Sequence, residues 1–240
     1  MDDKTMCLDK SIVRFLCNVY FTTGENDFEK ASFRAYLDFC RTIKFKDDYK
    51  GDKKEKEKED IKKAVSRLIE NFVKTIEHTP DVFDNIDDKN DNIINSHKKL
   101  CRMIINKFSE FTQPNTFTYG HAQKWVNMTL KYLYVLDKCK ERSTYDAIVS
   151  YFHVPIDNII LDMCSNPEEH NKNLPEGMQA LPEGFSVKRE GEEKDAWSTW
   201  KDYTYDSYRE KLEGQIKTCY GENTPPLIWE LENWAPKKDI

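Results

Sequence analysis

The sequence predicts an all-α protein, and three observations support this fold class. Apolar residues recur at intervals of three and four along most of the chain, as Ile61, Val65 and Leu68 do, which is the period of an amphipathic helix. The 240 residues include only 8 Gly and 9 Pro, so the many tight turns of an all-β fold are not expected. Aromatic residues make up 12% of the chain, which argues against global disorder although 33% of the residues are charged.

The helical period or a helix start signal marks nine segments of the chain. We expect the main helices over residues 9–21, 27–41, 61–78, 93–111, 121–136, 156–164 and 197–217, with shorter elements over residues 145–151 and 225–234. A mixed-charge loop is expected near residues 44–60, and a loop that contains Pro and Gly near residues 165–191. The length suits a single all-α domain that spans residues 1–240.

Composition and charge exclude several classes of protein. The net charge of −6 is unlike the strong basic excess of most nucleic-acid-binding proteins, although a local basic patch could still bind DNA. The seven cysteines are widely spaced without a C-x-x-C pair, so we expect buried free thiols and no metal centre. The chain begins Met-Asp-Asp-Lys without a signal-peptide pattern and has no apolar run long enough for a bilayer. We therefore expect a cytoplasmic protein with no membrane partner and no cofactor.

Residues 118–132 are the first candidate for chemistry. P-loop, G-x-G-x-x-G, G-x-S-x-G and H-E-x-x-H motifs are all absent, and the five histidines lack metal-ligand spacing. Here Gly120 suggests a turn that opens into a helix, with Lys124 in its first turn. The dipole at a helix start favours an anionic ligand and disfavours a protonated lysine, and only a neutral amine is a nucleophile. The alternative is that Lys124 is an ordinary surface lysine.

The second candidate segment is His153-Val154-Pro155-Ile156-Asp157. Asp157 stands at an expected helix start among apolar residues, so its carboxylate is either an N-cap or a general base that faces a cleft. His121 and His153 are candidates for ligand contacts, with capping or packing as the alternative.

Together these two segments, over residues 117–164, resemble the helix-hairpin-helix DNA glycosylase superfamily and look closest to its archaeal 8-oxoguanine branch. That superfamily places a lysine at the start of a helix after a hairpin, and an aspartate after a short apolar run that ends in a Pro-Ile-Asp type of motif. Lys124 and Asp157 match these two positions and are 33 residues apart. Lys131 matches a further lysine of that branch. The resemblance implies two helical subdomains that flank a cleft.

The activity implied by the resemblance is DNA base excision with lyase chemistry. A purine would be flipped into a pocket, Lys124 would attack the sugar as a Schiff-base nucleophile, and Asp157 would assist departure of the base. DNA would then be the partner. The residues implied to contact it are Gly120, His121, Gln123, Trp125, Asn127, Lys131 and His153.

A second hypothesis is a non-catalytic helical binding protein that acts on a protein partner or a nucleotide in bacterial or phage defence or counter-defence. The aromatic C-terminal part of the chain motivates it, because aromatic side chains dominate many recognition surfaces. The alternative is that these side chains pack into the core. They are Trp197, Trp200, Tyr203, Tyr205, Tyr208, Trp229 and Trp234.

Overall fold

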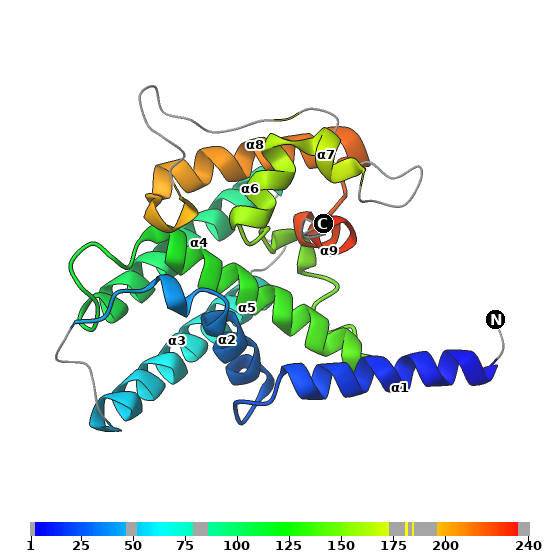
Figure 1. Cartoon of the computed structure of the whole chain (residues 1–240). Helices are drawn as coiled ribbons and strands as arrows, with labels where there is room; N and C mark the ends of the chain where they lie inside the picture. Colours follow the sequence, from blue (N-terminus) through cyan, green and yellow to red (C-terminus); the bar gives the residue numbers. More distant parts are fainter. Residues whose placement is uncertain are drawn as a thin grey trace.

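The chain folds into an all-helical structure, as the sequence predicted. The computed structural model describes residues 3–46, 52–78, 86–172, 181, 184 and 196–234. Among these residues, the only β-type pairing outside named elements is a bridge between Phe45 and Thr112. The α-helices are α1 (Asp3–Tyr20), α2 (Asp27–Leu37), α3 (Asp52–His78), α4 (Ile86–Ser109), α5 (Tyr119–Cys139), α6 (Asn158–Ser165), α7 (Pro167–Asn171), α8 (Asp202–Tyr220) and α9 (Pro226–Asn233) (Figure 1). The 3₁₀ turns are η1 (Cys40–Thr42), η2 (Val149–Tyr151) and η3 (Trp197–Thr199).

Two expected loops are shorter than the sequence suggested. The prediction of a mixed-charge loop near residues 44–60 is wrong from Asp52 onward, because α3 begins at that residue. Lysine and glutamate favour helices, and pairs such as Lys58–Glu55 at 2.7 Å stabilise this first part of α3. In the second loop, near residues 165–191, α7 begins at Pro167, which suits the first position of a helix. Most of the rest of that loop lies outside the described residues.

Helix α5 is the centre of the fold. Its first two turns are buried on every side, and such a helix must be surrounded by protein. Helices α1, α2, α4 and α8 and the turn η3 all contact it. The indole of Trp125, which has no exposed surface, donates its N–H to the carbonyl oxygen of Ser32 on α2 at 3.0 Å. The helix predicted over residues 121–136 therefore belongs to the element around which the others pack.

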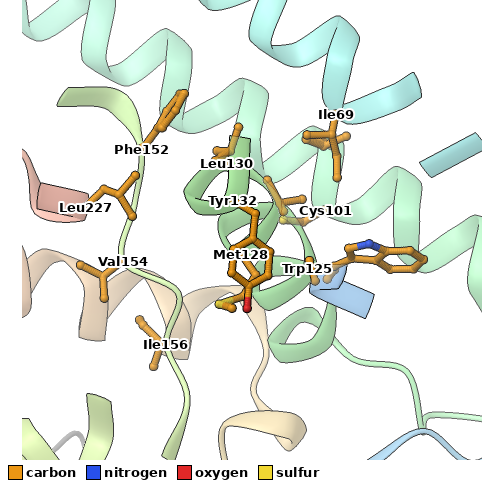
Figure 2. Close-up of a cluster of buried hydrophobic side chains, with 14 of the residues drawn as sticks. Ile69, Cys101, Trp125, Met128, Leu130, Tyr132, Phe152, Val154, Ile156 and Leu227 are labelled. Carbon is orange, nitrogen blue, oxygen red and sulfur yellow. The ribbon is translucent and has the colours of Figure 1, made fainter. Parts of the chain in front are cut away.

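The buried apolar side chains form one continuous cluster that runs from α2 to α9. Figure 2 shows an extended segment that carries Phe152, Val154 and Ile156 and passes beside α5, near Leu130. Trp229 of α9 joins the same cluster and has no exposed surface. Distant parts of the chain thus share one core.

Most of the C-terminal aromatic residues belong to this core. Five of the seven are buried, so packing is confirmed for them and they do not form a recognition surface. These five are Trp197, Trp200, Tyr205, Tyr208 and Trp229. Tyr203 and Trp234 are each 42% exposed.

Helix α1 is attached to the rest of the chain near its C-terminal end. Cys17 and Cys139 form a disulfide between α1 and α5, so the expectation of free thiols is wrong for this pair. Cys101 and Cys164 are free and buried, as expected. In the described parts of the chain, no helix combines the length and the apolar character that crossing a bilayer requires.

Gly120 allows the turn η3 to approach the start of α5. The sequence suggested a glycine turn before the helix, but Gly120 is the second residue of α5 itself. Its N–H donates to the carbonyl oxygen of Trp200 at 3.2 Å. A Cβ atom at this position would lie 1.8 Å from the carbonyl oxygen of Trp197. The glycine is therefore required for close backbone packing and not for a hairpin.

We expect Gly120→Ala to lower the free energy of unfolding by about 2 kcal/mol or more, because the methyl group would force η3 away from α5. The matched control is Gly214→Ala, in the interior of α8, where an added Cβ has no neighbour within 4 Å. That substitution should raise stability by roughly 0.5–1 kcal/mol, as expected for Gly to Ala in a helix. Chemical denaturation measures both values, and equal effects would contradict the packing role of Gly120.

Candidate functional site

The start of α5 is closed by the chain itself. Thr118 is its N-cap residue, and the Thr118 hydroxyl donates to the carbonyl oxygen of Ser198 at 2.7 Å. The Thr118 N–H donates to Nδ1 of His121 at 3.2 Å, so His121 acts as a capping residue. Because η3 covers this end, the open anion-binding helix start that the sequence suggested is not formed. Lys124 is the sixth residue of α5 and therefore lies in its second turn, not its first.

Lys124 and Asp157 lie side by side. The Nζ atom of Lys124 donates to Oδ2 of Asp157 at 3.0 Å, and the lysine is only 6% exposed. The other oxygen, Oδ1, accepts the N–H groups of Ile159 and Ile160 at 2.9 and 3.1 Å. Asp157 is thus the N-cap of α6 and the ion-pair partner of Lys124 at the same time.

The ammonium group of Lys124 also lies over an aromatic ring. Its Nζ atom is 4.7 Å from the ring centroid of Trp197, a cation–π contact. The carboxylate of Asp157 and the ring of Trp197 both stabilise positive charge at this position. A role as a nucleophile would first require transfer of the ammonium proton, and Oδ2 of Asp157 is the nearest acceptor.

A second buried ion pair lies two helical turns further along α5. Lys131 donates to Oε1 of Glu230 on α9 at 2.5 Å, and its Nζ atom is 5.5 Å from the ring centroid of Trp234. Glu230 is 1% exposed, and its Oε2 atom has no hydrogen-bond partner. Burial raises the pKa of the Glu230 carboxyl above its ordinary value, although the charge of Lys131 opposes this. Lys131 and Glu230 thus form the same kind of ion pair beside a tryptophan ring as Lys124 and Asp157.

These two ion pairs line a single cavity of about 940 Å³, to which α1, α2, α3, α5 and α9 contribute side chains. Its lining includes six basic residues and three carboxylates, an excess of three positive charges in a chain whose net charge is −6. The basic residues are Lys30, Arg34, Arg41, Lys62, Lys124 and Lys131, and the carboxylates are Asp38, Asp157 and Glu230.

Three of the basic residues in the lining pair with none of the carboxylates that the structure describes. Arg34 pairs with Asp38 at 2.9 Å, in addition to the two lysine pairs above. Among the described residues, no carboxylate lies within ion-pair distance of Lys30, Arg41 or Lys62. Their charge is therefore available to an anion that enters the cavity.

A hydrogen-bonded tyrosine pair forms another part of the wall. The hydroxyl of Tyr132 donates to Oδ2 of Asp38 at 2.5 Å and lies 2.9 Å from the hydroxyl of Tyr20. Burial and the nearby Asp38 charge raise the pKa of Tyr132, so its hydroxyl stays neutral. The guanidinium of Arg34 lies 4.0 Å from the ring centroid of Tyr20. This wall offers polar groups above an apolar surface, a combination typical of ligand pockets.

The polar residues predicted to touch DNA lie in the interior. Gln123 donates to the carbonyl oxygen of Ile156 at 3.0 Å, the residue directly before Asp157. Asn127 donates to the hydroxyl of Tyr205 at 3.0 Å, and that hydroxyl is also 3.0 Å from Nδ1 of His153. These bonds fix the extended segment against α5. Asp157 is thereby held next to Lys124.

Six of the seven predicted contact residues are buried, namely Gly120, His121, Gln123, Trp125, Asn127 and His153. Only Lys131 lines the cavity. No local motif links Glu230, Asp38 or Arg34 to Lys124 and Asp157, so none of these three residues was predicted from the sequence.

No protein-family model matches the chain, and no curated protein or solved structure shows significant similarity to it. The resemblance to the DNA glycosylases therefore stays a prediction. Among the described residues, no group of three or more His, Cys, Asp or Glu side chains could hold a metal ion.

Buried histidines make the stability of this region depend on pH. Burial lowers the pKa of His97 and of His121 to about 4, and it lowers the pKa of His153 well below its ordinary value. His97 Nε2 donates to Oδ1 of Asn127 at 2.9 Å, so it belongs to the same polar network. Between about pH 6.5 and pH 4 the unfolded chain binds more protons than the folded chain, because its histidines have ordinary pKa values.

We expect the free energy of unfolding to fall as the pH is lowered through this range, by up to about 1.4 kcal/mol per pH unit for each such histidine. The variant His97→Gln keeps a donor for Asn127 but removes one titrating group. Its stability should therefore depend less steeply on pH than that of the wild type. Urea unfolding at several pH values measures the slopes, and unfolding at pH 7.5 separates any loss of packing. Identical slopes would contradict the burial of a neutral His97.

Proposed function

We propose that the chain is a helical binding protein whose cavity takes a nucleotide or a similar anionic organic molecule. The observation that carries this proposal is the excess of positive charge in the lining of the cavity, within a chain of opposite net charge. A volume of about 940 Å³ lies within the range of sites for organic ligands.

The lining suits both parts of such a molecule. Lys30, Arg41 and Lys62 pair with no carboxylate of the described part of the chain and would bind phosphate groups. Met128 and Trp234 belong to the apolar part of the lining, against which an aromatic base would pack. A purely apolar ligand would bring no negative charge to these three basic groups, and a free phosphate would leave the apolar surface uncovered.

We expect adenosine and guanosine triphosphates to raise the melting temperature of the wild type and to bind measurably in calorimetry. Lys62→Glu replaces an attractive charge with a repulsive one, so it should weaken binding by about tenfold or more, which corresponds to roughly 1.4 kcal/mol. The matched control is Lys107→Glu, at an exposed position of α4 outside the cavity, which should bind like the wild type. Equal weakening in both variants would mean that only the overall charge matters.

A second candidate function is the lysine-dependent DNA glycosylase and lyase activity that the resemblance implies. It is supported by the distance of 3.0 Å between Lys124 Nζ and Asp157 Oδ2 at the cavity wall. Asp157 would accept the ammonium proton, and the neutral amine would bond to C1′ of the sugar as the C1′–N bond to the base breaks. The base would leave with the proton that Asp157 returns to it. The C1′–O4′ bond would then open to give the imine, with a proton from the attached nitrogen moving to O4′, and the imine would lose a C2′ proton as the C3′–O bond breaks and the phosphate leaves. This candidate includes DNA as the partner and a glycosylase-like arrangement of two helical subdomains.

Borohydride trapping on DNA with an abasic site or an 8-oxoguanine tests this second candidate. Wild type should form a covalent adduct, because reduction of the imine makes the bond permanent. Lys124→Ala should form none, although the Asp157 carboxylate can still cap α6 and preserve the fold. Lys107→Ala, which removes an exposed lysine of α4 outside the cavity, is the control and should still be trapped. An adduct in Lys124→Ala, or none in wild type, would exclude the lyase mechanism.

A further inference from the structure

The ion pair of Lys131 and Glu230 keeps hydrogen-bonding capacity that no described residue uses. Oε1 of Glu230 accepts from the Lys131 ammonium at 2.5 Å, whereas Oε2 has no partner in the described part of the chain. The ammonium carries three N–H groups, and the other two have no acceptor among the described residues. Both residues belong to the lining of the cavity, so a ligand that enters it can complete the pair.

The burial of Glu230 makes a donor from a ligand valuable at this position. Its side chain is only 2% exposed, so a free carboxylate oxygen here gains little from water. A hydrogen bond to such an oxygen recovers the cost of desolvation and is stronger than the same bond at the surface. The ammonium of Lys131 favours the charged carboxylate, which accepts hydrogen bonds and donates none.

The pair presents its free groups in a fixed order. Because Nζ of Lys131 binds Oε1 and not Oε2, a donor, an acceptor and a second acceptor follow one another along the pair. The complementary ligand edge is an acceptor followed by two donors.

Among adenine, guanine, cytosine and uracil, guanine has this edge. Its O6, N1–H and N2–H groups are one acceptor and two adjacent donors on the Watson–Crick edge, by which proteins also read unpaired bases. Adenine has one donor and one acceptor there, with a C–H in the third place. Cytosine presents a donor and two acceptors, and uracil places an acceptor on each side of its donor. Both pyrimidines would bring an oxygen against Oε2 of Glu230.

We propose that the cavity prefers guanine nucleotides and that Lys131 and Glu230 read the base. This preference rests on the nucleotide site proposed above and names the base that it takes. Lys131 donates to O6, Oε1 of Glu230 accepts N1–H, and Oε2 accepts N2–H. Adenine can bind only Lys131 and Oε1, through N1 and N6–H, and leaves Oε2 without a partner.

The surroundings of the pair suit a flat base. Trp234 lines the cavity, is 42% exposed and follows Glu230 by four residues, so both lie on one side of α9. Its ring centroid is 5.5 Å from Nζ of Lys131, which places an aromatic surface beside the reading groups. The three basic residues proposed to bind phosphate belong to α2, η1 and α3. The base and the phosphates therefore use different elements of the lining.

Calorimetry of the full-length wild type with GTP, inosine triphosphate and ATP tests this preference. Inosine triphosphate differs from GTP only in lacking the 2-amino group, so it loses the bond to Oε2 and keeps the other two. We expect GTP to bind about tenfold or more tightly than either of the other nucleotides, as for a hydrogen bond to a charged group. This comparison requires no substitution and is independent of effects on folding.

Glu230→Gln assigns the preference to the carboxylate. The amide keeps an oxygen for Lys131 but turns an N–H₂ group toward the 2-amino group of guanine, donor against donor. The ratio of GTP to inosine triphosphate affinity should fall to about twofold or less, whatever happens to the two affinities themselves. Glu232→Gln, at an exposed residue of α9 outside the lining, is the matched control and should keep the wild-type ratio.

Equal binding of the three nucleotides by wild type, weakened in each case by Lys62→Glu, would overturn the base preference and leave the nucleotide site in place. Tighter binding of ATP than of GTP would overturn it as well. A folded Glu230→Gln variant with the wild-type ratio would show that another group reads the 2-amino group. If wild type binds none of the three, the nucleotide site itself is wrong, and the base preference fails with it.

Discussion

The hydrogen bonds between α5 and the extended segment before α6 determine the geometry of the site. Gln123 binds the backbone at Ile156, and Asn127 joins Tyr205 and His97 in the same buried network. Buried amides are costly to leave without partners, so this network allows one register of the segment and excludes a slip by one residue. Asp157 follows directly from that register, and its carboxylate can then reach Lys124 and the N–H groups of α6 together.

The local parts of this arrangement could be predicted from the sequence, and the long-range parts could not. Helical spacing predicted α5 and its neighbours, whereas the proximity of Lys124 and Asp157 was implied only by the resemblance of their two segments to a known superfamily. The role of Gly120 was predicted wrongly, because the sequence does not distinguish a glycine that allows η3 to pack closely from a glycine in a turn. Glu230 is separated from Lys131 by 99 residues, and no periodicity connects two charges that distant.

Burial also overturns the role in ligand binding that was predicted for several polar residues. A histidine, a glutamine or an asparagine in a helix can serve a ligand or the core, and the sequence does not distinguish the two. In this fold His121, Gln123 and Asn127 serve the core, while the charges that face the cavity come from four helices. Net charge is equally uninformative about the site, because a chain of −6 carries a cavity lined with an excess of positive charge. Local potential, and not total charge, decides which ligands enter a cavity.

The position of α1 decides how well one wall of the cavity is formed. Leu16, Val19 and Tyr20 of this helix line the cavity, while Ile12 and Phe15 are exposed outside its lining. The disulfide between Cys17 and Cys139 and the two ion pairs with Glu141 hold another side of α1 at the C-terminal end of α5. A ligand that contacts this wall would therefore favour the attached position of α1, and its affinity would include the free energy of keeping the helix in place.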